Sequence, residues 1–231
     1  MTSAPRALQA RKRAPLAAAP AFAASALLTP RLAPHSRSLQ ARYGAGDVVW
    51  PAAVALARLI AHCPSFAAQK RVLELGAGLG LPGAAAAQAG AASLLLADRD
   101  AASLALAARS AALNAPALAE AGRVSKLVAD WGGDLDAWPP PGQVDLVLAS
   151  DVLYDATAPA AVAALLSRLL APAVGDAAPP EAPPRALFAD PPQRLHRDAF
   201  VAACAAQGLT AQVGPLPGPE GMTLIAVVRV A

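Results

Sequence analysis

The sequence has 231 residues, of which 56% are hydrophobic, and much of this hydrophobic content is alanine. Its length suits one α/β domain with a sizeable core and a short extension. No apolar stretch of about 20 residues runs without a proline, a glycine or a charge, so we expect no transmembrane helix. Cys63 and Cys204 lie far apart and the three histidines share no ligand spacing, so we expect neither a disulfide nor a metal site.

The net charge of +3 is unevenly distributed. Residues 1–46 contain seven arginines and lysines and no acidic residue, whereas the remainder carries 12 basic and 16 acidic residues, a net charge of −4. A nucleic-acid-binding surface would need a basic face, so a mildly acidic body argues against it. Such a body suits a cationic substrate.

Residues 1–42 form a leader rich in alanine, arginine and proline. This composition is typical of an organelle transit peptide, and a disordered basic tail with no targeting role is the alternative. A leader of this kind fits a plastid or a mitochondrion, and without such targeting we expect a cytoplasmic protein. We therefore predict a leader over 1–42 and a single domain over 43–231.

Apolar strands alternate with helices in the rest of the chain. In chain order, the pattern predicts a helix over 51–63, a strand over 71–75, a helix over 82–89, a strand over 93–98, a helix over 101–113, strands over 124–129 and 144–149, a helix over 158–171, a strand over 185–189, a helix over 194–207, and strands over 209–213 and 223–230. Asp100 is expected to cap the helix after it, and Pro116 to follow that helix's end. The proline- and alanine-rich segment 172–184 is expected to be a loop.

This alternation predicts an α/β fold with a seven-stranded, mostly parallel, Rossmann-like sheet and helices on both of its faces. The last two strands have no room for a crossover helix between them. They should therefore form an antiparallel hairpin at the edge of the sheet.

The glycine-rich segment 72–83 carries the strongest functional signal. A strand runs directly into Gly76, Ala77 and Gly78, and a helix follows at once, so backbone N–H groups can face a polar ligand. A plain strand-to-helix turn is one alternative. Dinucleotide binding is another, because Gly78, Gly80 and Gly83 also satisfy the GxGxxG pattern, which is weak by itself.

Two acidic residues flank this turn. Glu74 lies inside the first apolar strand. If the turn binds a cofactor with an amino-acid end, Glu74 would hold the loop or that end, a need that an NAD site does not have. Asp98 ends the second strand, where its carboxylate would accept hydrogen bonds from two ribose hydroxyls. A capping role for Asp98 is the alternative, but Asp100 already fills it.

Two further strand ends carry polar and aromatic side chains. Trp131 would pack on adenine and Asp130 would accept from its amine, unless Trp131 is a core residue. Asp151 and Tyr154 follow the fourth strand, where open α/β sheets bind ligands. If the turn there is helical, both side chains face the same point, and a carboxylate and a phenol suit an amine nucleophile. A capping Asp151 and a wall residue Tyr154 are the alternative.

Segments 46–53 and 74–83, together with Asp130-Trp131 and the run from Asp151 to Tyr154, resemble the seven-strand (class I) methyltransferases of lysine methyltransferase family 16. The resemblance covers residues 43–231. It implies that Trp50 lines the methionine end of S-adenosylmethionine, that Gly76, Ala77 and Gly78 contact this cofactor through backbone atoms, and that Ser150 touches it. Asp98 would hold the ribose and Trp131 would flank adenine.

In that family, the Asp-x-x-Tyr motif holds the target lysine, which assigns Asp151 and Tyr154 to catalysis. The resemblance therefore implies a protein-lysine methyltransferase with a protein partner. We also expect a monomer that binds no nucleic acid, membrane or metal. Methylation of a small amine or another protein side chain, an inactive cofactor-binding scaffold and an NAD oxidoreductase are the alternatives. The Asp-Pro at 190–191 also resembles one found in the organellar branch of the family.

Overall fold

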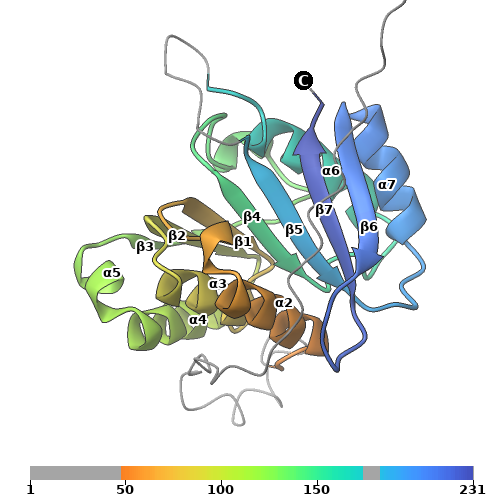
Figure 1. Ribbon diagram of the computed structural model, residues 1–231. Helices are drawn as coiled ribbons and strands as arrows, with labels where there is room; N and C mark the ends of the chain where they lie inside the picture. Colours follow the sequence, from red (N-terminus) through yellow and green to blue (C-terminus); the bar gives the residue numbers. More distant parts are fainter. Residues whose placement is uncertain (1–47, 174–182, 231) are drawn as a thin grey trace, which may run out of the picture.

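The computed structural model describes residues 48–173 and 183–230 (Figure 1). The leader expected over 1–42, the first residues of the expected domain and most of the 172–184 loop lie outside this part of the chain. In it, no helix is both long and apolar enough to cross a membrane.

Strands and helices alternate along the described chain. The α-helices are α2 (Pro51–His62), α3 (Leu81–Gln88), α4 (Ala101–Asn114), α5 (Pro116–Glu120), α6 (Ala158–Leu169) and α7 (Arg197–Ala206). The strands are β1 (Arg71–Leu75), β2 (Ser93–Asp98), β3 (Val124–Val128), β4 (Leu146–Ser150), β5 (Arg185–Asp190), β6 (Leu209–Pro215) and β7 (Thr223–Arg229). Short 3₁₀ turns cover Pro64–Phe66 (η2) and Leu135–Ala137 (η3).

The strands form one sheet in the order β3-β2-β1-β4-β5-β7-β6 (Figure 1). Strands β1 to β5 pair in parallel, whereas β7 runs antiparallel to both of its neighbours, β5 and β6. The predicted Rossmann-like sheet with an antiparallel edge hairpin is thus confirmed. The strand order reverses between β1 and β4, and ligands bind at such a switch point in open α/β sheets.

Helices cover both faces of the sheet. On one face α2, α3 and α4 pack together, and on the other α6 packs against α7 (Figure 1). Strand β1 shows how the sequence serves both layers, because side chains alternate between the faces of a strand. Val72 enters the first core, and Leu73 and Leu75 enter the second. Burial on both faces explains the nearly continuous apolar character of the central strands.

Two predicted boundaries were wrong, and one short helix was missed. Pro116 follows the end of α4, as expected, but it also begins the short helix α5, because proline suits the first helical position as well. Strand β4 begins at Leu146, after Asp145, whose carboxylate accepts hydrogen bonds from the backbone and guanidinium of Arg71. Helix α7 begins at Arg197, because the residues after β5 first form a turn in which Arg194 N–H donates to Pro191 O at 3.1 Å.

Candidate active site

The glycine turn joins β1 to α3 at the carboxyl end of the sheet. Gly76 has a φ of +64°, a left-handed conformation that favours glycine. A Cβ placed on Gly76 would lie 3.0 Å from Val152 Cγ1 and 3.3 Å from Trp131 Cζ3. Glycine is therefore needed at this position both for the left-handed conformation and for the close approach of Val152 and Trp131. The turn thus lies against the segments that follow β3 and β4.

Glu74 lies behind the turn and not in the open site. Its side chain is buried, and its Oε2 accepts a hydrogen bond from Gly83 N–H at 2.8 Å. Burial raises the pKa of Glu74 to about 8; the Asp98 charge adds to the rise and the Gly83 bond opposes it. A Cβ on Gly83 would lie 2.4 Å from Glu74 Oε2, so this third glycine of the GxGxxG pattern is required by packing. The contact supports the loop-holding alternative for Glu74.

Asp98 ends β2 and fastens the glycine turn. Its Oδ2 accepts from Gly78 N–H at 2.8 Å, and its Oδ1 accepts from Asp100 N–H at 3.0 Å. Asp100 caps α4, as expected, by accepting from the N–H groups of Ala102 and Ser103. Because each carboxylate oxygen accepts more than one hydrogen bond, Asp98 retains the capacity to bind ribose hydroxyls.

Trp131 connects the glycine turn with the end of β4. Its ring lies beside Gly76 and makes an edge contact with Tyr154, the ring centroids being 6.1 Å apart and the planes 65° apart. The preceding residue, Asp130, is exposed, and its Oδ1 accepts from Gly132 N–H at 2.8 Å, which shapes the loop. Trp131 thus offers an aromatic surface and Asp130 a carboxylate beside the turn.

Asp151 follows Ser150, the last residue of β4, and has a φ of +57°. A left-handed conformation is uncommon outside glycine, although aspartate tolerates it better than most residues, and it often marks a functional site. Its N–H donates to Ala189 O at 3.0 Å. The residues from Asp151 to Tyr154 form no helix, so the helical turn considered above is wrong. Burial raises the pKa of Tyr154, which keeps its hydroxyl protonated.

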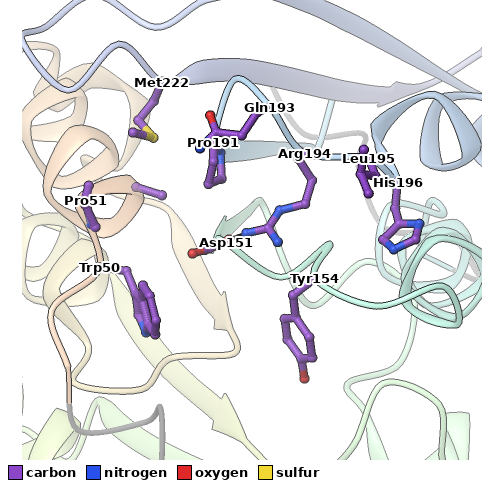
Figure 2. Close-up of a pocket in the computed structure, with 11 residues that line it drawn as sticks. Trp50, Pro51, Asp151, Tyr154, Pro191, Gln193, Arg194, Leu195, His196 and Met222 are labelled. Carbon is purple, nitrogen blue, oxygen red and sulfur yellow. Dashed lines mark ion pairs between the residues drawn. The ribbon is translucent and has the colours of Figure 1, made fainter.

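Asp151 and Tyr154 nevertheless meet in one pocket, with a volume of about 460 Å³, at the ends of β4 and β5 (Figure 2). Trp50, the residue before α2, forms another wall and is 42% exposed. The pocket is lined by Trp50, Pro51, Ala52, Asp151, Tyr154, Pro191, Gln193, Arg194, Leu195, His196 and Met222. Most of its walls are apolar and a few polar groups converge on it, as is typical of a small-ligand site.

Four charged side chains from the β4 and β5 ends form what we term the four-charge cluster: Asp151, Asp190, Arg194 and Arg197. Arg194 forms an ion pair with Asp151 through Nη2, and its Nε lies 3.6 Å from Asp190 Oδ1. Arg197 donates to Asp190 Oδ2 from Nε at 3.1 Å and from Nη2 at 2.9 Å. The cluster therefore balances two positive charges against two negative charges.

Sequence reasoning identified Trp50, Asp151 and Tyr154, which the structure brings together in the pocket, but it missed Arg194. The expected cofactor residues Gly76, Asp98 and Trp131 lie at the adjacent β1–β3 ends, outside the pocket lining. The sequence did contain a signal for Arg194, because Asp190 ends a parallel strand and two arginines follow it. In the described part of the chain, no group of three or more histidine, cysteine, aspartate or glutamate residues is arranged to hold a metal ion.

Comparison with known families agrees with this geometry. Residues 37–174 match the family described as lysine methyltransferase. The chain belongs to this family. The dinucleotide-binding alternative is therefore set aside, which agrees with an antiparallel β7 in place of the parallel sixth strand of the usual NAD-binding order.

Two curated relatives match part of this chain. The protein N-lysine methyltransferase METTL21A of Danio rerio is 38% identical over 49% of this chain and 50% of its own length. The histone-arginine methyltransferase METTL23 of Xenopus laevis is 36% identical over 48% of this chain and 45% of its own. The chain thus matches about half the length of each of these relatives.

Solved methyltransferases share the fold of this family member. Magnesium protoporphyrin IX methyltransferase from Synechocystis PCC 6803, solved with bound S-adenosylmethionine, has a TM-score of 0.54 and 18% identity, covering 77% of this chain and 81% of its own. Geranyl diphosphate C-methyltransferase from Streptomyces coelicolor has a TM-score of 0.54 and 16% identity, covering 77% and 78%. At these identities the likeness establishes the fold alone.

Proposed function

We propose that this protein is an S-adenosylmethionine-dependent methyltransferase that methylates lysine side chains of a protein substrate. The observation that carries the proposal is the position of Trp131. Its ring lies beside Gly76 and makes an edge contact with Tyr154, so it joins the glycine turn to the pocket of Asp151 and Tyr154. A methyl donor held at the turn and an amine held in the pocket would meet beside this ring.

The residues at the β1–β3 ends have the chemistry that the cofactor needs. Asp98 offers carboxylate oxygens suited to ribose hydroxyls, and it already binds the turn through Gly78. Asp130 and Trp131 offer an acceptor and an aromatic face for adenine. Trp50 lies at the pocket wall, where the methionine end would face the acceptor.

When bound, S-adenosylmethionine supplies an electrophilic methyl group, and the amine lone pair forms the N–C bond while the C–S bond breaks with its electron pair left on sulfur. The chain's own residues orient the acceptor for this step. The Asp151 carboxylate accepts a hydrogen bond from the amine, and the protonated hydroxyl of Tyr154 offers a second polar contact. The apolar walls keep bulk water away from the reacting amine.

Methyl-label transfer tests the proposal. The full chain would be incubated with labelled S-adenosylmethionine and a protein extract, and labelled products identified by mass spectrometry. We expect label on lysine side chains. Label confined to small amines or to other side chains would contradict the lysine assignment, and calorimetry showing tight NAD binding without S-adenosylhomocysteine binding would contradict the cofactor.

Two substitutions separate the acceptor side from the cofactor side. Asp151→Ala should lower turnover by a factor on the order of 10²–10⁴, because the amine loses its hydrogen-bond acceptor, and should leave the Kd for S-adenosylhomocysteine within a few-fold of wild type. Asp98→Ala should raise that Kd about 10- to 100-fold, because two hydrogen bonds to a charged group are lost. Turnover assays and calorimetry measure both effects. Equal loss of cofactor binding in the two variants would show the roles to be wrongly assigned.

A further inference from the structure

The candidate acceptor pocket contains a positive charge of its own. Figure 2 shows Arg194 reaching from the loop after β5 to Asp151, the carboxylate expected to receive the acceptor. One Asp151 oxygen meets the guanidinium, and the other points away from it toward the Trp50 side of the pocket. An acceptor amine that approaches Asp151 therefore also approaches Arg194.

The four-charge cluster has no surplus negative charge for an incoming cation. Its side chains are largely shielded from solvent, with exposed fractions of 13% for Asp151, 2% for Asp190, 20% for Arg194 and 15% for Arg197. The two carboxylates are already matched by the two guanidinium groups. A lysine ammonium at Asp151 would be a third positive charge in a poorly solvated place, where like charges repel strongly.

The pKa of Arg194 is lowered by its surroundings. Burial lowers the pKa of Arg194, and the nearby charge of Arg197 lowers it further. A guanidinium stays protonated in spite of such shifts, because its ordinary pKa is so high. A primary amine in the same place gives up its proton far more readily, because its ordinary pKa is lower.

We propose that Arg194 is a positioning and specificity-determining residue that makes the acceptor pocket select the neutral form of a primary amine. The ion pair holds Asp151 in place as a hydrogen-bond acceptor while cancelling the charge that would trap a lysine as an unreactive ammonium ion. The proton of the ammonium passes to solvent on entry, and the lone pair that remains is free to form the new N–C bond. This inference rests on the proposed function.

Other ionisable groups lie close to Asp151 and Arg194. Tyr154 and His196 line the same pocket, whereas Asp190 and Arg197 lie beside Arg194. The residues that α2 and the segment before β7 contribute, Pro51, Ala52 and Met222, carry no charge. The test therefore has to isolate the charge of Arg194 from the other groups of the pocket, which a charge-conserving variant does.

The test compares two cofactor analogues in binding experiments that need no acceptor. S-adenosylhomocysteine lacks the methyl group. Sinefungin has a carbon in place of the sulfur and an amine in place of the methyl group, so its amine is directed toward the acceptor. We expect Arg194→Met to strengthen binding of sinefungin relative to S-adenosylhomocysteine by a factor on the order of ten at neutral pH. Removal of the Arg194 charge should raise the pKa of the bound sinefungin amine by about one unit, and one pKa unit corresponds to tenfold. Arg194→Lys, which keeps the charge, should retain the wild-type ratio.

Arg71→Met is the matched control. Arg71 also forms a hydrogen-bonded ion pair with an aspartate, Asp145, but does so at the opposite ends of β1 and β4, away from the pocket. Its removal should leave the affinity ratio of the two analogues unchanged. An Arg194→Met ratio no different from that of Arg71→Met would overturn the inference while leaving the proposed function intact. Failure of the wild-type chain to bind either analogue would overturn both.

A pH profile of methyl transfer gives a second readout. With a protein extract as acceptor, the acid limb of the rate of label incorporation should move upward by about one pH unit in Arg194→Met, because the amine then keeps its proton to higher pH. Arg194→Lys should show the wild-type limb. A rate that rises at every pH in Arg194→Met, with no shift of the limb, would instead identify Arg194 as a simple competitor of the substrate and contradict the inference.

Discussion

Glu74 is an ionisable group in an apolar interior, immediately behind the glycine turn. Its carboxyl group is buried between β1 and α3, where it accepts from Gly83 N–H. Transfer of a charge into such surroundings is costly, so burial raises the pKa of Glu74 to about 8 and the group is mostly protonated at neutral pH. Its main contribution is therefore to hold α3 against the sheet, and through α3 to fix the turn.

This protonation makes stability depend on pH. The unfolded chain releases the Glu74 proton near the ordinary glutamate pKa and the folded chain does so only near 8, so between about pH 4.5 and 8 the folded state binds more protons. Stabilisation by the raised pKa is complete below that window and is lost as pH rises through it, by at most about 1.4 kcal/mol per pH unit.

Glu74→Gln should remove this part of the pH dependence. The amide oxygen can still accept from Gly83 N–H, but the side chain no longer titrates. Urea unfolding at several pH values between 5 and 8 measures the free energy of unfolding of both proteins. We expect the wild-type value to fall relative to the variant as pH rises, and parallel curves would contradict a raised Glu74 pKa.

At the scale of elements, the contact of α3 with the sheet determines where the turn lies. Gly83 lies in the first turn of α3 at a point where backbone and sheet approach closely. A Cβ there would meet Glu74 Oε2 at 2.4 Å and Leu96 Cδ2 at 2.9 Å. Both neighbours are buried, so neither can move aside without disturbing the core.

Gly83→Ala should therefore destabilise the protein by about 1–3 kcal/mol, the usual cost of overpacking, in spite of the better helix propensity of alanine. Gly214→Ala in β6 is the matched control, because a Cβ there has no neighbour within 4 Å. It should be neutral or stabilising by up to about 1 kcal/mol. Thermal or urea unfolding measures both, and equal effects would show that the close approach at Gly83 has no energetic consequence.

At the scale of the whole molecule, two separate cores hold one sheet, and the site lies along the carboxyl ends of its parallel strands. The first core joins α2, α3 and α4 to the sheet, and the second joins α6 and α7 to it. Both faces contribute to the acceptor pocket, because Pro51 and Ala52 of α2 line it from the first face and the loop with Arg194 leads into α7 on the second. The glycine turn, by contrast, leads into α3 on the first face alone.

The leader over 1–42 bears on where the whole protein works, and we propose that it directs import into a plastid or a mitochondrion. Its support is compositional: it is basic, free of acidic residues and rich in alanine. A fluorescent protein fused after residue 42 should accumulate in one of these organelles, as fluorescence microscopy would show. Diffuse cytosolic fluorescence, equal to that of the unfused fluorescent protein, would reject import.

The local sequence determined most of the fold and half of the site. Apolar runs between helical segments predicted the strands along the chain, because burial on both faces makes each strand apolar by itself. Asp98, Trp131 and Asp151 could be found because each follows or ends such a strand. The strand with its glycine turn, Glu74 and later strand ends together indicated the family, which the match over residues 37–174 confirmed.

Only the tertiary structure decided how the acceptor side is built. Asp151 and Arg194 are far apart in sequence, and they meet because β4 pairs with β5 and the turn after β5 brings Arg194 to the end of β4. Neither periodicity nor composition encodes such a contact. The helical turn considered after β4 is likewise absent, and Asp151 there has a left-handed backbone conformation. The sequence therefore predicted a carboxylate for an amine, and the structure added the guanidinium that shares it.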